Sequence, residues 1–372
     1  MREIRVLHVG MTPNYGGLES FVMNIYRNID RSKVQFDFLT LYGDKIAYED
    51  EIIAMGGKVY PILYKRRDVV KHFLYLPFNF FKKHREIQIV HFHKSHLADL
   101  DYLIVAKMCG VPVRIVHAHS SGYIFPLGKI AKFTEKMNKK YINKLATHKL
   151  SCSDLAGKWM FDDLSYEVVP NAIDIDKFKF DTNKRDKMRK ELNLDNKFVV
   201  GHVGTFFDVK NQTFLVDVFK EFLKKRSDAI LLFIGEGPMK NEVVEKVHKL
   251  NLDDKVIFTG SIKNVNEYFQ AMDVFTLPSK FEGFPIVSVE AQTAGLPCVV
   301  SSNVTKEIAI TDQVFFRSIE NVDDWVDTLL DISNKNKRYD NVQKIRDAGY
   351  DIKTMSKQME QFYIDAVKHC YR

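Results

Sequence analysis

Two glutamates, Glu282 and Glu290, lie eight positions apart in the segment "SKFEGFPIVSVEAQTAGLPCVV" at residues 279–300. Between them, Gly283 and Pro285 predict a loop followed by a helix with the proline in its first turn. The first amide groups of a helix have no partner within the helix, so they can bind a diphosphate. Ionised carboxylates accept hydrogen bonds from sugar hydroxyls. The segment therefore predicts a nucleotide-sugar site, with one glutamate on the ribose and the other on the second sugar.

Two other interpretations of these glutamates are open at this point. Glu282 could be an ordinary loop residue, with Glu290 a charge on the helix surface. The pair could also be the acid and the nucleophile of a glycosidase, in which the carboxyl groups lie about 5–10 Å apart. Their position on one loop–helix unit, beside an anion-binding helix end, favours binding over hydrolysis.

Three other turns follow predicted strands and carry residues that suit anions. Adjacent glycines, Gly16 and Gly17, precede a predicted helix at 19–29. Gly204 ends a strand, and Lys210 lies beside a helix start, where a cation is unfavourable unless an anion is bound. The third turn is "GEGP" at 235–238. Each turn also has an ordinary interpretation, as a flexible turn, a solvated lysine or a tight connection, and the first lacks the dinucleotide motif GxGxxG.

Strands and helices alternate along the chain, which predicts parallel sheets covered by helices. Two such series indicate two doubly wound, Rossmann-like domains, and the length of 372 residues permits two cores. We expect an N-terminal domain at 1–175, a C-terminal domain at 176–351, and an amphipathic helix at 352–372 packed back on the first domain. The expected strands are 4–10, 34–41, 58–63, 87–93, 113–119, 148–153, 166–173, 197–204, 229–237, 255–261, 274–279 and 297–302.

Histidines recur at the ends of two of these strands, in "HFH" and "HAH". A histidine that follows an apolar strand is more often a hydrogen-bonded core residue than a metal ligand. We therefore predict no metal site and keep only one of the group as functional. The group comprises His91, His93, His96, His117 and His119, and the functional candidate is His119.

Charge and composition favour a soluble, cytoplasmic protein. Hydrophobic residues make up 45% of the chain, four cysteines are scattered, and neither a signal peptide nor a membrane-spanning segment is expected. The net charge is +7, with basic residues and aromatics concentrated at 58–85 and further lysines at 129–149. This mixture predicts binding to an anionic membrane surface, although a solvated basic face is the simpler alternative. Charge alone also suggests a nucleic-acid binder, which we do not favour.

Taken together, the motifs resemble the retaining glycosyltransferases of family 4, whose signature has two glutamates flanking seven residues. The similarity extends to "GGLESFVMN", "VHAHSSG", "VVPNAIDIDKF", "VGTFFDVKNQ" and "GEGP". It implies the GT-B fold, an α/β architecture with two Rossmann-like domains facing across a cleft. It also implies sugar transfer from a nucleotide sugar with retention, and no essential metal or other cofactor.

The resemblance assigns a role to each matching residue. Glu290 would hold the ribose, Glu282 the donor-sugar hydroxyls, Lys210 the leaving diphosphate, and His119 would lie near the transferred sugar. The catalytic candidates are therefore Glu282, Lys210 and His119. The implied donor-binding residues are Gly16, Gly17, Gly204, Thr205, Lys210, Glu236, Gly237, Glu282, Gly283, Phe284, Pro285, Ile286, Val287 and Glu290.

One residue departs from the family pattern. The family commonly has arginine after the glycine that matches Gly204, and here the residue is Thr205, which cannot replace a bidentate phosphate contact. Similar proteins build capsular, exopolysaccharide or O-antigen units, which implies a UDP-sugar donor, a lipid-diphosphate-linked saccharide acceptor and the inner face of the cell membrane. The alternatives are a nucleotide-sugar epimerase or a phosphorylase on the same scaffold, and a non-catalytic nucleotide-sugar-binding protein.

Overall fold

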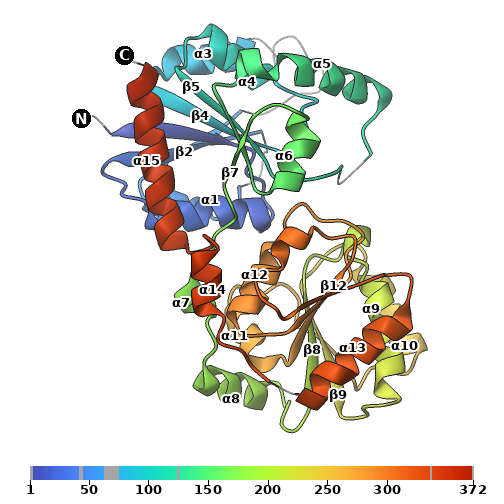
Figure 1. The fold of residues 1–372 in the computed structure, drawn as a ribbon. Helices are drawn as coiled ribbons and strands as arrows, with labels where there is room; N and C mark the ends of the chain where they lie inside the picture. The colour runs from blue at the N-terminus through green and yellow to red at the C-terminus, as the bar shows by residue number, and fades with distance from the viewer. Residues whose placement is uncertain (1–2, 42–44, 63–74, 124–125, 336, 371–372) are drawn as a thin grey trace. The chain divides into compact units, whose positions relative to one another are not determined.

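The computed structural model describes residues 3–41, 45–62, 75–123, 126–335 and 337–370. The chain forms two compact units (Figure 1). Unit 1 comprises residues 1–172 and 352–372, and unit 2 comprises residues 173–351. The division falls three residues before the expected boundary, because Ile173 already pairs with Asp351 in a short parallel bridge within unit 2.

Unit 1 contains a seven-stranded parallel sheet in the order β3-β2-β1-β4-β5-β6-β7. From β1 to β3 successive strands are added toward one edge of the sheet, and from β4 to β7 they are added toward the other edge. This is the doubly wound arrangement. The strands are β1 (Ile4–Val9), β2 (Val34–Thr40), β3 (Val59–Pro61), β4 (Ile87–Lys94), β5 (Val113–Ala118), β6 (His148–Ser151) and β7 (Glu167–Val168).

Helices cover both faces of this sheet, as right-handed crossovers in opposite directions require. On one face α1 packs against α15, and α15 also contacts β2, β4 and β5. On the other face α4 contacts α3, α5, β4 and β5. The helices of unit 1 are α1 (Gly17–Asn28), α2 (Glu49–Ala54), α3 (Leu76–Lys83), α4 (Asp101–Met108), α5 (Lys129–Leu145), α6 (Asp154–Phe161) and α15 (Ile352–Cys370).

Unit 2 repeats the doubly wound plan with a six-stranded parallel sheet in the order β10-β9-β8-β11-β12-β13. The strands are β8 (Phe198–Val203), β9 (Ala229–Ile234), β10 (Val256–Phe258), β11 (Val274–Leu277), β12 (Cys298–Ser301) and β13 (Val314–Arg317). The helices are α7 (Ile175–Phe178), α8 (Thr182–Glu191), α9 (Gln212–Leu223), α10 (Lys240–Lys249), α11 (Val265–Ala271), α12 (Ile286–Thr293), α13 (Val322–Lys335) and α14 (Val342–Asp347), with 3₁₀ turns η2 (Asp208–Lys210) and η3 (Lys306–Ile308).

The prediction of two Rossmann-like domains is confirmed, and every expected strand forms. One further strand, β13, was not predicted, because it is an edge strand whose residues are only half-buried. In α15 the buried face includes Met355, Met359 and Tyr363, which pack into the core of unit 1. Tyr363 is fully buried, whereas its neighbour Phe362 is only partly buried.

The remaining sequence expectations concern the surface and the membrane. Of the basic stretch 58–85, residues 63–74 lie outside the described residues. Among the described helices, none combines the length and the apolar character needed to cross a bilayer. The four cysteines are free thiols.

Candidate functional site

The candidate site of unit 2 lies where the strand order of its sheet reverses. β8 and β11 are neighbouring parallel strands, and the chain leaves them toward helices on opposite sides. Loops at such a switch point diverge and leave a crevice at the carboxyl ends of the strands. The loop after β8 carries Lys210, and the loop after β11 carries Glu282. Two residues chosen separately from the sequence therefore come from adjacent strands.

Lys210 and Glu282 form an ion pair, with Nζ 2.5 Å from Oε1. Their side chains are only 18% and 15% exposed, so solvent screens the pair weakly. Ser279 donates a second hydrogen bond to the same carboxylate oxygen at 2.8 Å. The backbone reinforces the contact, because the amide of Lys280 donates to the carbonyl of Val209 at 2.8 Å. The pair joins the two loops and holds a cation and a carboxylate side by side.

A buried histidine, which sequence reasoning missed, supports the loop after β8. Burial lowers the pKa of His202 to about 4, so the ring is neutral at physiological pH. Its Nδ1 lies 3.0 Å from the carbonyl of Thr276, and its Nε2 lies 3.3 Å from Nε2 of Gln212. Gln212 also donates to the carbonyl of Thr205 at 3.0 Å. The side chain of Thr205 itself is exposed. The sequence around His202 shows only a single histidine in an apolar strand, so its contacts to the loop after β8 could not be predicted.

The glycine turn after β9 packs against the same loop. Gly237 has φ +155°, and a Cβ there would lie 2.6 Å from the carbonyl oxygen of Phe206. The amide of Phe206 donates to the carbonyl of Glu236 at 2.9 Å. The side chain of Glu236 forms an ion pair with Lys240, with a separation of 2.6 Å. Close packing therefore explains Gly237 without a ligand, and Glu236 lies at the edge of this loop group.

Glu290 lies one turn inside α12, which follows the Glu282 loop and has Pro285 as its N-cap. Its side chain is partly buried, and no hydrogen bond reaches its carboxylate from the described residues. Burial raises the pKa of Glu290 to about 7, an effect that the charge of Lys177 on α7 partly offsets. Gly295 has φ +73° and follows the end of the helix, where a left-handed conformation favours glycine. The helix thus presents a carboxylate that can accept hydrogen bonds from a ligand.

In unit 1, the loop after β1 is organised by Glu19, a residue the sequence analysis had placed only at a helix start. Its carboxylate is buried and accepts hydrogen bonds from the amide and the hydroxyl of Thr12, at 3.0 and 2.7 Å. It also accepts from the amide of Gly16, the N-cap of α1, at 3.1 Å, which is the half of a capping box that a glycine N-cap permits. A Cβ on Gly17 would meet nothing within 4 Å, so packing within the described protein does not require this glycine.

Five histidines lie near the carboxyl ends of β1, β4 and β5, on the face covered by α1 and α15. They are His8, His91, His93, His117 and His119. The i, i+2 spacing of His91 with His93, and of His117 with His119, places each pair on one face. Nδ1 of His91 lies 2.8 Å from the hydroxyl of Tyr363 on α15, and Nε2 of His91 lies 3.2 Å from Nδ1 of His117. The prediction that the strand-end histidines are hydrogen-bonded core residues holds only in part, because Nε2 of His117 is buried without a partner among the described residues. His8 was not part of that prediction, and its Nε2 is likewise buried without a partner there.

Two overlapping groups of these histidines have nitrogen atoms within 4.8 Å of one another and could hold a metal ion. The groups are His8, His91 and His93, and His93, His117 and His119. His119 is partly buried, whereas the other four are buried.

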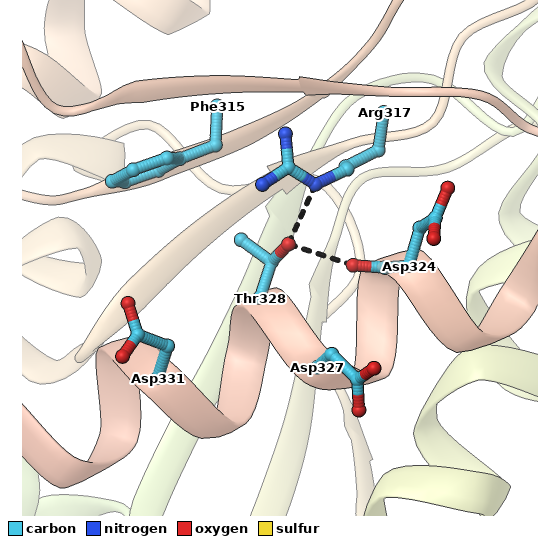
Figure 2. Close-up of a pocket in the computed structure, with 6 residues that line it drawn as sticks. All are labelled: Phe315, Arg317, Asp324, Asp327, Thr328 and Asp331. Atoms are coloured by element: carbon cyan, nitrogen blue, oxygen red, sulfur yellow. Dashed lines mark hydrogen bonds between the residues drawn. The ribbon is translucent and has the colours of Figure 1, made fainter.

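A separate hollow lies over β13 and α13, with β12 between β13 and the switch point. Figure 2 shows that Arg317 already donates to the hydroxyl of Thr328, at 2.7 Å, and that this hydroxyl donates to the backbone of Asp324. The remaining lining residues are Phe315, Asp327 and Asp331. This hollow contains none of the residues singled out from the sequence.

Comparisons with known proteins identify the family of this chain. Residues 183–348 match the family described as glycosyl transferases group 1, and residues 15–177 match glycosyltransferase family 4. The glycosyltransferase EpsF of Bacillus subtilis is 32% identical over 82% of this chain and 80% of its own length. A relative from Escherichia coli, the UDP-Gal:alpha-D-GlcNAc-diphosphoundecaprenol alpha-1,3-galactosyltransferase, is 24% identical over 98% of both chains.

Solved structures show the same fold. The Anabaena protein HepE, in complex with UDP, matches with a TM-score of 0.81 at 16% identity, over 97% of this chain and 100% of that chain. These matches confirm the resemblance found in the motifs. The chain is therefore a transferase with the GT-B fold, and it belongs to the family 4 glycosyltransferases.

Proposed function

We propose that this glycosyltransferase moves a sugar from a UDP-sugar to a saccharide carried on a lipid diphosphate, with retention at the anomeric carbon. The observation that carries the proposal is the Lys210–Glu282 pair at the switch point of unit 2, followed by the free carboxylate of Glu290 on α12. The names of two relatives support the substrates: the Escherichia coli enzyme is named for a UDP-galactose donor and a diphosphoundecaprenol-linked acceptor, and HepE was solved with UDP.

Within unit 2 we propose the roles that the family resemblance implies. Lys210 neutralises the charge that develops on the leaving diphosphate, where a preplaced cation has its largest effect on rate. Glu290 accepts hydrogen bonds from the ribose, and Glu282 accepts them from hydroxyls of the donor sugar. The backbone from Gly283 to Val287, at the start of α12, contacts sugar and phosphate, with Gly204, Thr205, Glu236 and Gly237 at the edge of the donor site.

Within unit 1, Gly16, Gly17 and His119 are our candidates for contacts to phosphate and sugar. We propose that no metal or other cofactor takes part, because Lys210 and the helix N-terminus supply the positive charge that a diphosphate needs. Chelation with EDTA should then leave the transfer rate unchanged, and a loss of rate that Mg²⁺ or Mn²⁺ restores would contradict this point.

We also propose that the enzyme works at the inner face of the cell membrane, docked through α5. Along this helix Ile130, Phe133, Met137 and Tyr141 are 82%, 66%, 36% and 48% exposed. Their spacing of i, i+3, i+7 and i+11 places them in one stripe. The helix also carries six lysines and a single acid, Glu135, which is buried and accepts a hydrogen bond from the amide of Leu97. An apolar stripe beside exposed cations suits an anionic lipid surface and not nucleic acid.

Release of UDP from a panel of UDP-sugars, with and without a lipid-diphosphate saccharide, tests the main proposal. We expect acceptor-dependent UDP release and a product with the donor's anomeric configuration by NMR. Lys210→Met should lower kcat roughly 100-fold or more, because one preplaced charge on a leaving group contributes that much. Glu290→Gln should weaken donor binding roughly tenfold, because a hydrogen bond to a charged group is lost.

Lys240→Met is the matched control, since it also breaks a lysine–glutamate pair in unit 2 but lies at the edge of the loop group. It should leave kcat within a factor of about three of the parent rate, well short of the loss that a removed transition-state charge causes. Nucleotide-sugar binding without turnover would identify a binding protein, and interconversion of the free sugar nucleotides would identify an epimerase. Either result would overturn the proposal.

A further inference from the structure

A chain of three hydrogen-bonded imidazoles runs through the interior of unit 1 and ends on His119. Nδ1 of His8 lies 2.9 Å from Nε2 of His93, and Nδ1 of His93 lies 2.9 Å from Nε2 of His119. His8 and His93 come from β1 and β4, neighbouring strands of the sheet (Figure 1), and His119 follows β5. The rings of His8 and His93 are nearly coplanar, with an interplanar angle of 8°, which suits a bond in the ring plane.

Each ring of this chain carries a single proton. Burial lowers the pKa of His8 and of His119 to about 3, and burial with neighbouring imidazoles lowers the pKa of His93 well below its ordinary value. A neutral imidazole has one N–H donor and one acceptor nitrogen. Once the proton is placed on one ring, the donor and acceptor nitrogens of the other two are therefore fixed.

The buried end of the chain sets its direction. Nε2 of His8 is enclosed and has no partner among the described residues, and the ring lies 4.1 Å from that of Phe36. Buried N–H groups without an acceptor are rarer in proteins than acceptors without a donor. The proton of His8 therefore belongs on Nδ1, where it is donated to His93. His93 then donates from its own Nδ1 to Nε2 of His119.

We propose that His8 and His93 are positioning residues that hold His119 as the tautomer with its proton on Nδ1. Nε2 of His119 is occupied by His93, and no described residue bonds its Nδ1. His119 is only partly buried. The chain therefore presents an N–H donor to an oxygen of a bound ligand, either a sugar hydroxyl or a phosphate. The identity of that ligand rests on the proposed function, whereas the tautomer does not.

The contacts between the rings argue for this chain and against a metal ion. Zinc–nitrogen bonds of about 2.0–2.1 Å in a tetrahedron place ligand nitrogens about 3.3 Å apart, with their lone pairs aimed at one point. Here the successive nitrogens face each other pairwise at 2.9 Å. A second set of bonds, from Tyr363 through His91 to His117, does not include His119 and gives a matched control.

The direct test is ¹⁵N NMR of the imidazoles in the purified full-length protein without substrate. We expect the protonated-nitrogen shift at Nδ1 and the unprotonated shift at Nε2 for His8, His93 and His119. A proton on Nε2 of His119, or a stoichiometric zinc ion in the purified protein, would overturn the proposal. This measurement needs no turnover, so it stands even if the transferase assay fails.

Substitutions separate positioning from simple packing. His93→Leu removes the donor and should lower kcat at least tenfold with little change in donor KM. His93→Asn can return an amide N–H to the position of Nδ1 and should restore kcat to within about threefold, because the same donor is present again. Tyr363→Phe breaks the other set of bonds and should leave kcat unchanged. Equal losses of kcat in all three variants would show a packing role only, and would also overturn the proposal.

Discussion

At the scale of single residues, we propose that Lys210 determines how a donor can enter. Without a ligand its charge is matched by Glu282, and its side chain is mostly buried. Binding a diphosphate therefore requires Lys210 to share or exchange its partner. Thr205 stands where the family commonly has an arginine, and its exposed hydroxyl adds no positive charge. We infer that this enzyme relies on Lys210 and on the helix N-terminus for its phosphate contacts.

Gly17 is a second residue that can be tested by mutation, to learn whether its lack of a side chain serves stability or activity. It is the first residue of α1, and a Cβ there has open space. Gly17→Ala should leave the free energy of unfolding unchanged or raise it by up to about 1 kcal/mol, since alanine is the better helix former. If the backbone approaches a phosphate there, the same change should lower kcat/KM at least tenfold. Chemical denaturation and initial rates measure the two effects.

The control for that change is Gly128→Ala, at the start of α5, where a Cβ also meets nothing within 4 Å. It should leave kcat/KM for donor and a detergent-dispersed acceptor unaltered. An unaltered kcat/KM in Gly17→Ala as well would mean that Gly17 serves only the turn.

At the scale of elements, the exposed stripe of α5 makes the membrane proposal measurable. The wild-type protein should pellet with anionic liposomes and less so as salt rises. Replacing Ile130 and Phe133 with serine should weaken pelleting at least tenfold, because each side chain contributes about 1.5–3 kcal/mol when buried in an apolar phase. Val244→Ser, at a 39% exposed position of α10 in unit 2, is the control and should change nothing. Failure of the wild type to pellet with any liposome would exclude docking by α5.

Also at this scale, the loops of the candidate site in unit 2 are held by backbone contacts and buried side chains. Gln212 joins the loop after β8 to His202, and Gly237 lets the turn after β9 pack against Phe206. Sites supported in this way keep their geometry before a ligand arrives.

At the scale of the whole molecule, the two units have separate cores that share no residue, so we expect two unfolding transitions in calorimetry. The transition of unit 1 should fall steeply in acid. Its five clustered histidines have pKa values lowered below the 6.5 of an unfolded histidine, chiefly by burial. Unfolding therefore takes up protons, and the stability present above pH 6.5 is lost as the pH falls toward the folded values.

Between pH 7 and pH 5.5 this loss amounts to about 1 kcal/mol for each histidine. The unfolding transition of unit 2 should move less with pH. Burial lowers the pKa of His202 and raises the pKa of Glu290, so the two groups change the stability of unit 2 in opposite directions as the pH falls. Met359→Ala on α15 and Leu329→Ala on α13 assign the transitions, since each removes a core side chain from one unit. A unit 1 transition that does not move with pH would contradict the buried, neutral histidine cluster.

The sequence alone was sufficient for the architecture and for part of the site. Alternating apolar strands predicted both sheets, and helix-start signals located Lys210, Glu282 and Glu290. It could not show that Lys210 and Glu282 touch, because they are 72 residues apart and their contact depends on the pairing of β8 with β11. The histidine chain was missed for the same reason, since three adjacent strands must first form.

The placement of α15 has a consequence for how the protein is made. Unit 1 needs residues 352–372, which are synthesised after the whole of unit 2, whereas unit 2 is continuous in the chain. At a synthesis rate of about 5–20 residues per second, residues 1–172 wait roughly 10–40 s for the helix that completes their core. The unit encoded second can therefore fold first, and the nascent sheet of unit 1 exposes apolar surface that chaperones can bind until α15 has been synthesised.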